Sequence, residues 1–288
     1  MNYIILDFEW DGTYNRNLGR FINQILQIGA VKLNSNFDIV DTFERTIKSS
    51  FSNRISKRFL ELTGITKQDM LSGVSLKSAV LEYNNWAGDG AVTMSWSDSD
   101  LYTLLENEKY LLSDLKLKMT KYLDLQKYIQ GEMRILGLEC NSQISLLNAA
   151  KALNVEVDET SLHNAKADSL ACAAMLKKYY NFERFNSLIE DTSNPDFFER
   201  LSFKPYFISD INDKDIDKSQ LEFVCLDCGR KLKIRKNWHF KCGTFFAEMR
   251  CEKCKKNFSA RVKFRKYYDR VKVKRNIYEI IPKEDIAD

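Results

Sequence analysis

The sequence predicts an α/β protein in which a mixed sheet flanked by helices is followed by a small β-rich C-terminal domain. Two observations predict the first domain: apolar runs typical of strands come first, and helical patterns then alternate with further strands. A third predicts the second domain, because residues 258–265 alternate strictly between apolar and basic side chains, as a half-buried strand does. With 288 residues and 44% hydrophobic content, the chain can form one large core and one small one.

The N-terminal part predicts three strands that pair as an antiparallel meander. The first strand is the apolar run at residues 3–6, and the next two lie at 25–33 and 37–47, joined by a short turn. The elements expected after them are helices at 55–62 and 75–86, a strand at 91–96, a helix at 98–108, a strand at 122–125, and helices at 144–153 and 164–179.

Three segments follow from the composition. Residues 1–181 are expected to form the α/β domain, and residues 221–288 the β-rich domain. The segment between them, residues 182–220, contains two prolines and an acidic patch, but also too many aromatic residues for a free linker. We expect it to pack on the first domain and then to release the chain near residues 210–219.

Several protein classes are excluded by the composition. No run of 18 or more apolar residues is present, so no transmembrane helix is predicted. The N-terminus enters a strand at once and lacks the pattern of a signal peptide. Seven cysteines, an odd number that includes two Cys-x-x-Cys pairs, favour metal binding in a reducing compartment over disulfides. A cytoplasmic protein with no membrane partner is therefore expected.

The net charge of +4 conceals a strong asymmetry along the chain. Between Cys225 and Arg275 there are 18 Lys and Arg against four acids, a net charge of +14, so the rest of the chain carries −10. A basic domain joined to an acidic one indicates that the basic part holds a polyanion.

The first strand is followed by two acids, Asp7 and Glu9. They lie two residues apart, so both carboxylates point to one face of the sheet while Phe8 points to the other. Adjacent carboxylates repel each other unless a cation lies between them, which favours a metal site. A polar strand end with two solvated acids is the alternative.

Three polar residues further along the chain are candidate partners of this pair. Asp100 follows the predicted strand at 91–96, although an acid in the first turn of a helix is also explained by the helix dipole. His163 and Asp168 are five residues apart, which on one continuous helix would place their side chains about 140° apart. If both serve one site, His163 must lie on the loop before the helix and Asp168 in its first turns. A single His is otherwise more often structural.

In this order and spacing, the motifs resemble those of the DEDD family of 3′–5′ exonucleases, in the histidine-bearing (DEDDh) branch, which has a ribonuclease H-like fold. The resemblance covers roughly residues 1–181. Asn164 stands where the sister branch has a Tyr, four residues before the last acid, so the histidine branch fits better. Gln27 departs from the family pattern, in which many relatives have an acid, but lies outside the ligand set. The matching segments are Asp7-Phe8-Glu9, residues 95–100 and residues 163–168.

The resemblance implies hydrolysis of phosphodiester bonds with two divalent ions, Mg²⁺ or Mn²⁺, held by carboxylates, the ligands that these ions prefer. Asp7 would bridge the two ions. Glu9 and Asp168 would complete the first site, and Asp100 would support the second. His163 would act as the general base, because none of the four acids is a good proton acceptor once it holds metal.

Four cysteines in the C-terminal domain have a spacing similar to that of a zinc ribbon. Two Cys-x-x-Cys pairs separated by 22 residues predict one structural Zn²⁺ in a tetrahedral site, which allows a small segment to fold. Cys242 and His239 are rival ligands, and four unpaired thiols are the alternative. The predicted ligands are Cys225, Cys228, Cys251 and Cys254.

Basic side chains occupy one face of the predicted C-terminal strands. With Trp238, Tyr267 and Tyr268 nearby, this face fits phosphate contacts together with base stacking. A solvated basic face or an acidic protein partner is the alternative. The predicted nucleic-acid-binding residues are Arg261, Lys263, Arg265, Arg270, Lys272 and Lys274.

These observations favour a metal-dependent 3′–5′ exonuclease that acts on single-stranded nucleic acid. RNA is the favoured substrate, because the segment around Leu62 is similar to that of the RNA-processing relatives. A proofreading-type DNA exonuclease is the near alternative. A non-catalytic nucleic-acid-binding adaptor on the same fold is the other, although such a protein would have no reason to keep four acids and a histidine.

Overall fold

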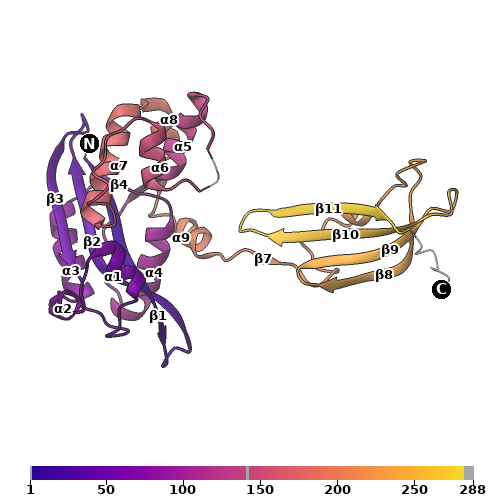
Figure 1. The fold of residues 1–288 in the computed structure, drawn as a ribbon, viewed down its shortest axis with the longest axis horizontal. Coiled ribbons are helices and arrows are strands. Elements are labelled where there is room, and N and C mark those ends of the chain that lie inside the picture. Colours follow the sequence, from indigo (N-terminus) through magenta and orange to yellow (C-terminus); the bar gives the residue numbers. More distant parts are fainter. Residues whose placement is uncertain (1, 141–142, 282–288) are drawn as a thin grey trace, which may run out of the picture. The chain divides into compact units, whose positions relative to one another are not determined.

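The structure is a computed structural model that describes residues 2–140 and 143–281. The chain forms two compact units, Met1–Leu201 and Ser202–Asp288, whose helices and strands are labelled in Figure 1. The expected connector, residues 182–220, is divided between them. Phe185 and Phe197 lie in cores of the first unit, whereas Ile216 lies in the core of the second.

The first unit is built on a mixed six-stranded sheet with the strand order β3-β2-β1-β4-β5-β6. β1, β2 and β3 form the predicted antiparallel meander, β4 and β5 run parallel to β1, and β6 pairs antiparallel with β5. The strands are β1 Tyr3–Asn15, β2 Arg20–Leu33, β3 Ile39–Thr46, β4 Val92–Ser95, β5 Lys121–Asp124 and β6 Glu190–Asp191.

Helices cover both faces of this sheet, which confirms the predicted fold class. Alternate residues of β1 contribute to two separate cores: Leu6 and Phe8 to one, with residues of α3, α4 and α9, and Ile5 to the other, with residues of α5, α6, α7 and α8. The helices are α1 Lys57–Thr63, α2 Lys67–Ser72, α3 Leu76–Ala87, α4 Ser99–Leu111, α5 Leu125–Ile135, α6 Leu146–Ala152, α7 Ala165–Tyr179, α8 Phe182–Ser187 and α9 Pro195–Ser202.

Helix α5 is absent from the sequence-based prediction. Asp124 ends strand β5 and is also the N-cap of α5, because its Oδ1 accepts a hydrogen bond of 3.0 Å from the backbone N–H of Lys127. The strand therefore passes into the helix without a connecting loop, and the turn residues that usually mark a boundary are missing.

The second unit is a five-stranded sheet in the order β11-β10-β9-β8, with β7 paired to β10. The predicted alternation along β10 is present, since Phe258 and Phe264 are buried while Arg261 and Arg265 are exposed. The strands are β7 Tyr206–Phe207, β8 Lys233–Lys241, β9 Thr244–Arg250, β10 Asn257–Lys266 and β11 Val271–Glu279, and a 3₁₀ turn, η1, spans Lys218–Leu221.

None of the helices in the described part of the chain combines the length and the apolar composition needed to span a membrane.

Candidate active site and cysteine cluster

Strand β1 carries Asp7 and Glu9 at the centre of the first sheet. The structure places both carboxylates on the face covered by α7, while Phe8 is buried in the opposite core. Ligand oxygens of Asp7, Glu9 and Asp168 lie within 4.8 Å of one another. Residues 161 positions apart in the chain therefore meet at one point, in the arrangement that the motif order suggests.

Asp168 reaches this point because α7 begins directly over strand β2. Gly29, the neighbour of Asp7 across the β1–β2 ladder, has no side chain to keep the helix away. A Cβ atom at Gly29 would lie 2.2 Å from the backbone of Ala165 and Lys166. Any larger residue would push the first turn of α7, and with it Asp168, away from the sheet.

Side chains at the start of α7 fix it further. Asn164 caps the helix by accepting a 3.1 Å hydrogen bond from the N–H of Ala167, and Gln27 accepts one of 3.0 Å from the N–H of Ala165. Glu44 on β3 accepts a hydrogen bond of 2.8 Å from the side-chain amide of Asn164. Its other carboxylate oxygen forms an ion pair of 2.5 Å with Lys166. Gln27, which departs from the family pattern, thus helps to hold the helix that carries Asp168.

His163 lies on the loop before α7, the position that the five-residue spacing requires. Its side chain is exposed and lines the same cleft as the acids. Its backbone has φ 67°, a left-handed conformation that non-glycine residues rarely adopt. Such a conformation persists only where surrounding contacts impose it, and it is common at functional sites.

Asp100 enters from the first turn of α4. It is only 2% exposed, and its Oδ1 accepts a 3.0 Å hydrogen bond from the backbone N–H of Phe8. Asp100 is not part of the group of three carboxylates within 4.8 Å, but it lines the same cleft. The four acids and His163 therefore border one cavity.

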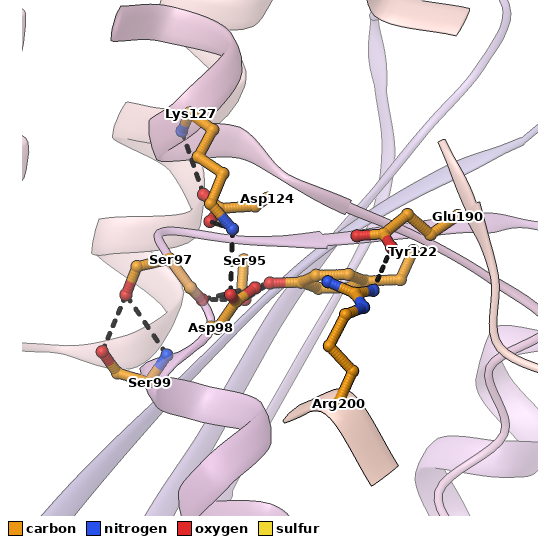
Figure 2. A network of polar contacts seen from close by, with 9 residues as sticks. All are labelled: Ser95, Ser97, Asp98, Ser99, Tyr122, Asp124, Lys127, Glu190 and Arg200. Carbon is orange, nitrogen blue, oxygen red and sulfur yellow. Dashed lines mark hydrogen bonds and ion pairs between the residues drawn. The ribbon is translucent and has the colours of Figure 1, made fainter. Parts of the chain in front are cut away.

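The turn between β4 and α4, which positions Asp100, is held by a polar network (Figure 2). Ser97 has φ 86°, and its carbonyl oxygen accepts hydrogen bonds from Ser95 at 2.7 Å and from the hydroxyl of Tyr122 at 3.1 Å. Lys127 binds Asp98 at 3.0 Å and Asp124 at 2.8 Å. These contacts join the turn to β5 and α5, so the unusual backbone at Ser97 is supported from two neighbouring elements.

The cleft has a volume of about 660 Å³ and is open to solvent. Lys127 and Tyr102 line it and were missed by sequence reasoning. Lys127 follows the N-cap of a helix that was not predicted, whereas Tyr102 carries no sequence signal of its own. The remaining lining residues are Trp10, Trp96, Ser97, Asp98, Ser99, Asp124, Gln126, Gln143, Ile144, Ser145 and Leu146, together with Phe8 and the five predicted site residues.

The electrostatics of the cleft favour a bound cation. Burial and the charges of Asp100, Glu9 and Asp168 raise the pKa of Asp7 well above its usual value. Burial and the charge of Asp168 raise the pKa of Glu9 to about 8, and burial raises the pKa of Asp100 to about 8. Burial also raises the pKa of Asp168 to about 6, although the nearby His163 opposes the increase. Each shift reflects carboxylates that are costly to ionise together without a positive partner.

One carboxylate oxygen in this group is buried and has no hydrogen-bond partner within the described residues. It is Oδ1 of Asp168. An unsatisfied buried carboxylate oxygen is rare and costly, and it is explained where an ion binds. The donor set, three convergent carboxylates with a fourth beside them, fits a hard divalent cation such as Mg²⁺ or Mn²⁺.

The second unit holds a different kind of cluster. The sulfur atoms of all four predicted cysteines lie within 4.8 Å of one another, and Sγ of Cys228 is 3.6 Å from Sγ of Cys251. A hydrogen bond from the backbone of Cys254 lowers the pKa of Cys251 to about 7, whereas the side-chain hydrogen bond with Cys228 raises the pKa of Cys254, so Cys251 is the thiol that ionises more readily of the two. Neither Cys242 nor His239 belongs to this cluster.

The two Cys-x-x-Cys segments have the same backbone geometry. The carbonyl of Cys225 accepts the N–H of Gly229 at 3.0 Å, and that of Cys251 accepts the N–H of Lys255 at 2.9 Å. Gly229 and Lys255 both have positive φ, 68° and 59°. The two turns therefore present their sulfur atoms in equivalent ways, as two metal-binding turns around one tetrahedral ion do.

The predicted basic residues of the second unit are all exposed. Arg261, Lys263 and Arg265 project from the face of β10 opposite to the core, and Lys272 and Lys274 lie directly across from two of them on β11. Arg270 lies in the turn before β11. The aromatic residue Trp238 does not join this face, because it is half-buried and packs against the core residue Phe223.

Comparison with known proteins identifies curated relatives that are similar to part of this chain. Ninety residues are 32% identical to the PolC-type DNA polymerase III of Staphylococcus aureus strain bovine RF122 / ET3-1, which covers 30% of this chain and 6% of the polymerase. The same enzyme from strain MW2 is 31% identical over 90 residues, with the same coverage. The chain thus spans only a small part of the length of these curated relatives.

Two solved structures share the fold of the first unit. Cell-death related nuclease 4 aligns with a TM-score of 0.53 at 18% identity, covering 62% of this chain and 62% of the nuclease. The nuclease domain of 3′hExo, a DEDDh family member bound to rAMP, aligns with a TM-score of 0.51 at 19% identity, covering 62% of this chain and 90% of that domain. The predicted ribonuclease H-like fold is confirmed.

Residues 4–176 match the family model of the RNase T type, described as exonuclease. This range contains Asp7, Glu9, Asp100, His163 and Asp168, the residues that border the cleft. The match covers more than half of the chain and confirms the resemblance seen in its motifs. The chain belongs to the RNase T exonuclease family.

Proposed function

We propose that this protein is a metal-dependent 3′–5′ exonuclease that removes nucleotides from the 3′ end of single-stranded nucleic acid, with RNA favoured. The observation that carries the proposal is the convergence of Asp7, Glu9 and Asp168 within 4.8 Å, together with a buried oxygen of Asp168 that accepts no hydrogen bond from any residue the structure describes. A binding-only protein gains nothing from this costly arrangement of carboxylates.

Two divalent ions, when bound, would neutralise charge on the scissile phosphate and orient the attacking water. Asp7 would contact both ions, which is supported by its position close to the charges of all three other acids. Glu9 and Asp168 would complete the ligand set of one ion. Asp100 would support the other through the carboxylate oxygen that does not accept from Phe8.

His163 takes the proton from the attacking water. Among the described residues that border the cleft it is the one imidazole, and its exposure lets it approach a water molecule above the carboxylates. The four acids would bind the metal ions rather than transfer protons. Lys127 lies at the same cleft, but its pairing with Asp98 and Asp124 suits it to support of the β4–α4 turn.

RNA is proposed as the substrate because the segment around Leu62 resembles that of RNA-processing relatives, and a protein of similar fold was crystallised with rAMP. Proofreading of DNA is the second candidate, favoured by the similarity of 90 residues to PolC-type DNA polymerase III. The two candidates differ in the sugar that the 3′ end must present to the cleft.

The second unit is proposed to be a zinc ribbon that holds nucleic acid through its basic residues. Four sulfur atoms within 4.8 Å, on two turns of equivalent geometry, support one structural Zn²⁺. No cysteine in the described residues forms a disulfide, and we propose that the protein works under the reducing conditions of the cytoplasm.

A single set of digestions tests the catalytic proposal. Matched RNA and DNA oligonucleotides, labelled at the 5′ end, should be shortened stepwise from the 3′ end when Mg²⁺ or Mn²⁺ is added. Asp7→Asn should abolish shortening of both. Shortening of RNA alone or of DNA alone would decide between the two substrates, and shortening of neither with both ions would contradict the exonuclease assignment.

A further inference from the structure

The outer face of the second sheet carries a continuous row of aromatic and cationic side chains. His239 on β8 lies across from Phe246 on β9, which in turn lies across from Arg261 on β10. The rings of His239 and Phe246 are stacked, with centroids 5.6 Å apart and an angle of 22° between their planes. The guanidinium of Arg261 lies 5.5 Å from the ring of Phe246 and 5.0 Å from that of Tyr278 on β11.

This row crosses all four long strands on the side that does not face the core. Phe245, Ala247 and Met249, the neighbours of Phe246 along β9, are buried on the opposite side, and Tyr278 is 49% exposed. Aromatic rings aligned beside an arginine on an exposed face indicate a binding surface rather than a face that contacts only water. We define the four residues His239, Phe246, Arg261 and Tyr278 as the stacking row.

Basic side chains surround the stacking row. Arg265 lies 5.6 Å from the ring of Phe207 on β7 and 5.5 Å from that of Tyr267, and Lys263 lies 5.9 Å from Phe207. Glu248, the acid on this side of β9, is already paired with Lys236 at 2.6 Å. In the part of the chain that the structure describes, no acidic side chain forms an ion pair with Arg261, Lys263 or Arg265.

Flat π surfaces at the strand spacing of about 4.8 Å, bordered by cations, are the features that bind unpaired bases and the phosphates between them. Duplex bases stack on one another and cannot reach such rings, whereas phosphates alone would need only the cations. We propose that this face binds single-stranded nucleic acid by stacking unpaired bases on the stacking row, with Lys263, Lys272 and Lys274 holding the backbone. The inference rests on the proposed function only in taking nucleic acid as the ligand.

The test measures binding rather than hydrolysis. The chain of residues 1–288 carrying Asp7→Asn, without added Mg²⁺, is titrated into three labelled ligands of equal length. They are a single-stranded RNA, the matching duplex, and a phosphodiester strand that lacks bases. Phe246→Ala and Tyr278→Ala should each weaken binding of the single strand roughly tenfold. Both should leave the base-free strand unchanged. Phe246→Trp, which keeps a ring in the row, should bind the single strand nearly as the parent does.

Phe240→Ala is the matched control. Phe240 is also an exposed ring on β8, but it contacts the buried Phe245 and lies outside the stacking row. Its loss should not alter binding of the single strand. Lys272→Gln should weaken all three ligands by a similar factor, because it removes a phosphate contact without touching the row.

Equal binding of the single strand by parent, Phe246→Ala and Tyr278→Ala would overturn the proposal, as would equal losses on the base-free strand. Melting curves and zinc content of each variant identify any that fail to fold, and Tyr278→Ala, which removes a ring that is 49% exposed, then decides the question. Loss of catalysis in the parent would refute the proposed function without affecting this result, since the binding measurement uses a catalytically blocked chain.

Discussion

The backbone N–H of Phe8 donates a buried hydrogen bond of 3.0 Å to Oδ1 of Asp100, a residue 92 positions away in the chain. Phe8 lies between Asp7 and Glu9, so this bond attaches the second motif to the strand that carries the first. The side chain of Phe8 meanwhile fills the opposite core. One residue thus anchors the strand on one side and positions a carboxylate on the other.

Two substitutions of Asp100 distinguish the contribution of its charge to catalysis from the contribution of its hydrogen bond to stability. Asp100→Asn keeps an oxygen that accepts from Phe8, so the fold should persist, but loss of the charge should lower the rate of 3′ shortening at least about 100-fold. Asp100→Ala should add a loss of stability of about 1–3 kcal/mol, because the N–H of Phe8 is left unsatisfied. Digestion rates and thermal unfolding check both results. Parental turnover by the Asn variant would remove Asp100 from the site.

The raised carboxyl pKa values predict how metal-free stability depends on pH. The pKa of Glu9 and of Asp100 is about 8, and that of Asp168 about 6, whereas unfolded carboxyls titrate near 4. Between these values the folded state binds more protons than the unfolded one, so the stability from this cluster is full below about pH 4 and is lost as pH rises to 8.

Added Mg²⁺ or Mn²⁺ should reverse that loss, because the ion balances the ionised carboxylates only in the folded state. The increase in Tm on adding either ion should therefore grow from pH 5 to pH 8. Thermal unfolding across this range provides the measurement, and Glu9→Gln, which removes one titrating carboxyl, should weaken the pH dependence. An ion-induced increase in Tm that is the same at every pH would count against a cluster of protonated acids.

His163→Asn should lower kcat by about 10²–10⁴-fold, the usual contribution of a positioned general base. Its side chain is exposed, and Asn tolerates the left-handed backbone at this position, so the variant should fold normally. The increase in Tm caused by Mg²⁺ should be retained, because His163 is not among the carboxylate ligands. A variant that loses both turnover and the metal response would instead show that His163 organises the site.

Much of the first unit could be predicted because its signals are local. The two acids on β1 share a face by the period of a strand, and the position of His163 before α7 follows from helix geometry. The approach of α7 to β2 is not local. It depends on Gly29 and Gln27, whose partners lie about 136 residues away, and a single sequence does not reveal which glycine a helix will cross.

The same limit explains what was missed in the second unit. The alternation of Phe258 and Arg261 along β10 is visible in the sequence and was predicted. The row that joins Phe246 to Arg261 and Tyr278 depends on the register of neighbouring strands, which one strand does not encode. Trp238 was accordingly expected on the basic face, although it packs with the core.

Gly29→Ala tests the approach of α7 to the sheet. The added Cβ would meet the backbone of Ala165 and Lys166 at 2.2 Å, which no side-chain rotation relieves. The variant should lose more than 1 kcal/mol of stability and, by displacing Asp168, most of its activity. Gly131→Ala is the control: it lies in α5 with open space around its Cβ, and should gain up to about 1 kcal/mol. Comparable losses in both variants would show that the close approach is unimportant.

Zinc content separates the four clustered cysteines from the others. Purified parent chain should contain about one zinc per molecule, because two equivalent turns present four sulfur atoms to one centre. Cys251→Ser should lose the ion and unfold the second unit, since the ion stabilises a sheet with only a small core. Cys242→Ser, at an exposed thiol in the β8–β9 turn, should keep both zinc and structure.

Both cysteine variants should still hydrolyse short oligonucleotides, because the carboxylate cluster lies wholly in the other unit. Zinc retained by Cys251→Ser but lost by Cys242→Ser would move the site to the hairpin turn and contradict the four-cysteine assignment.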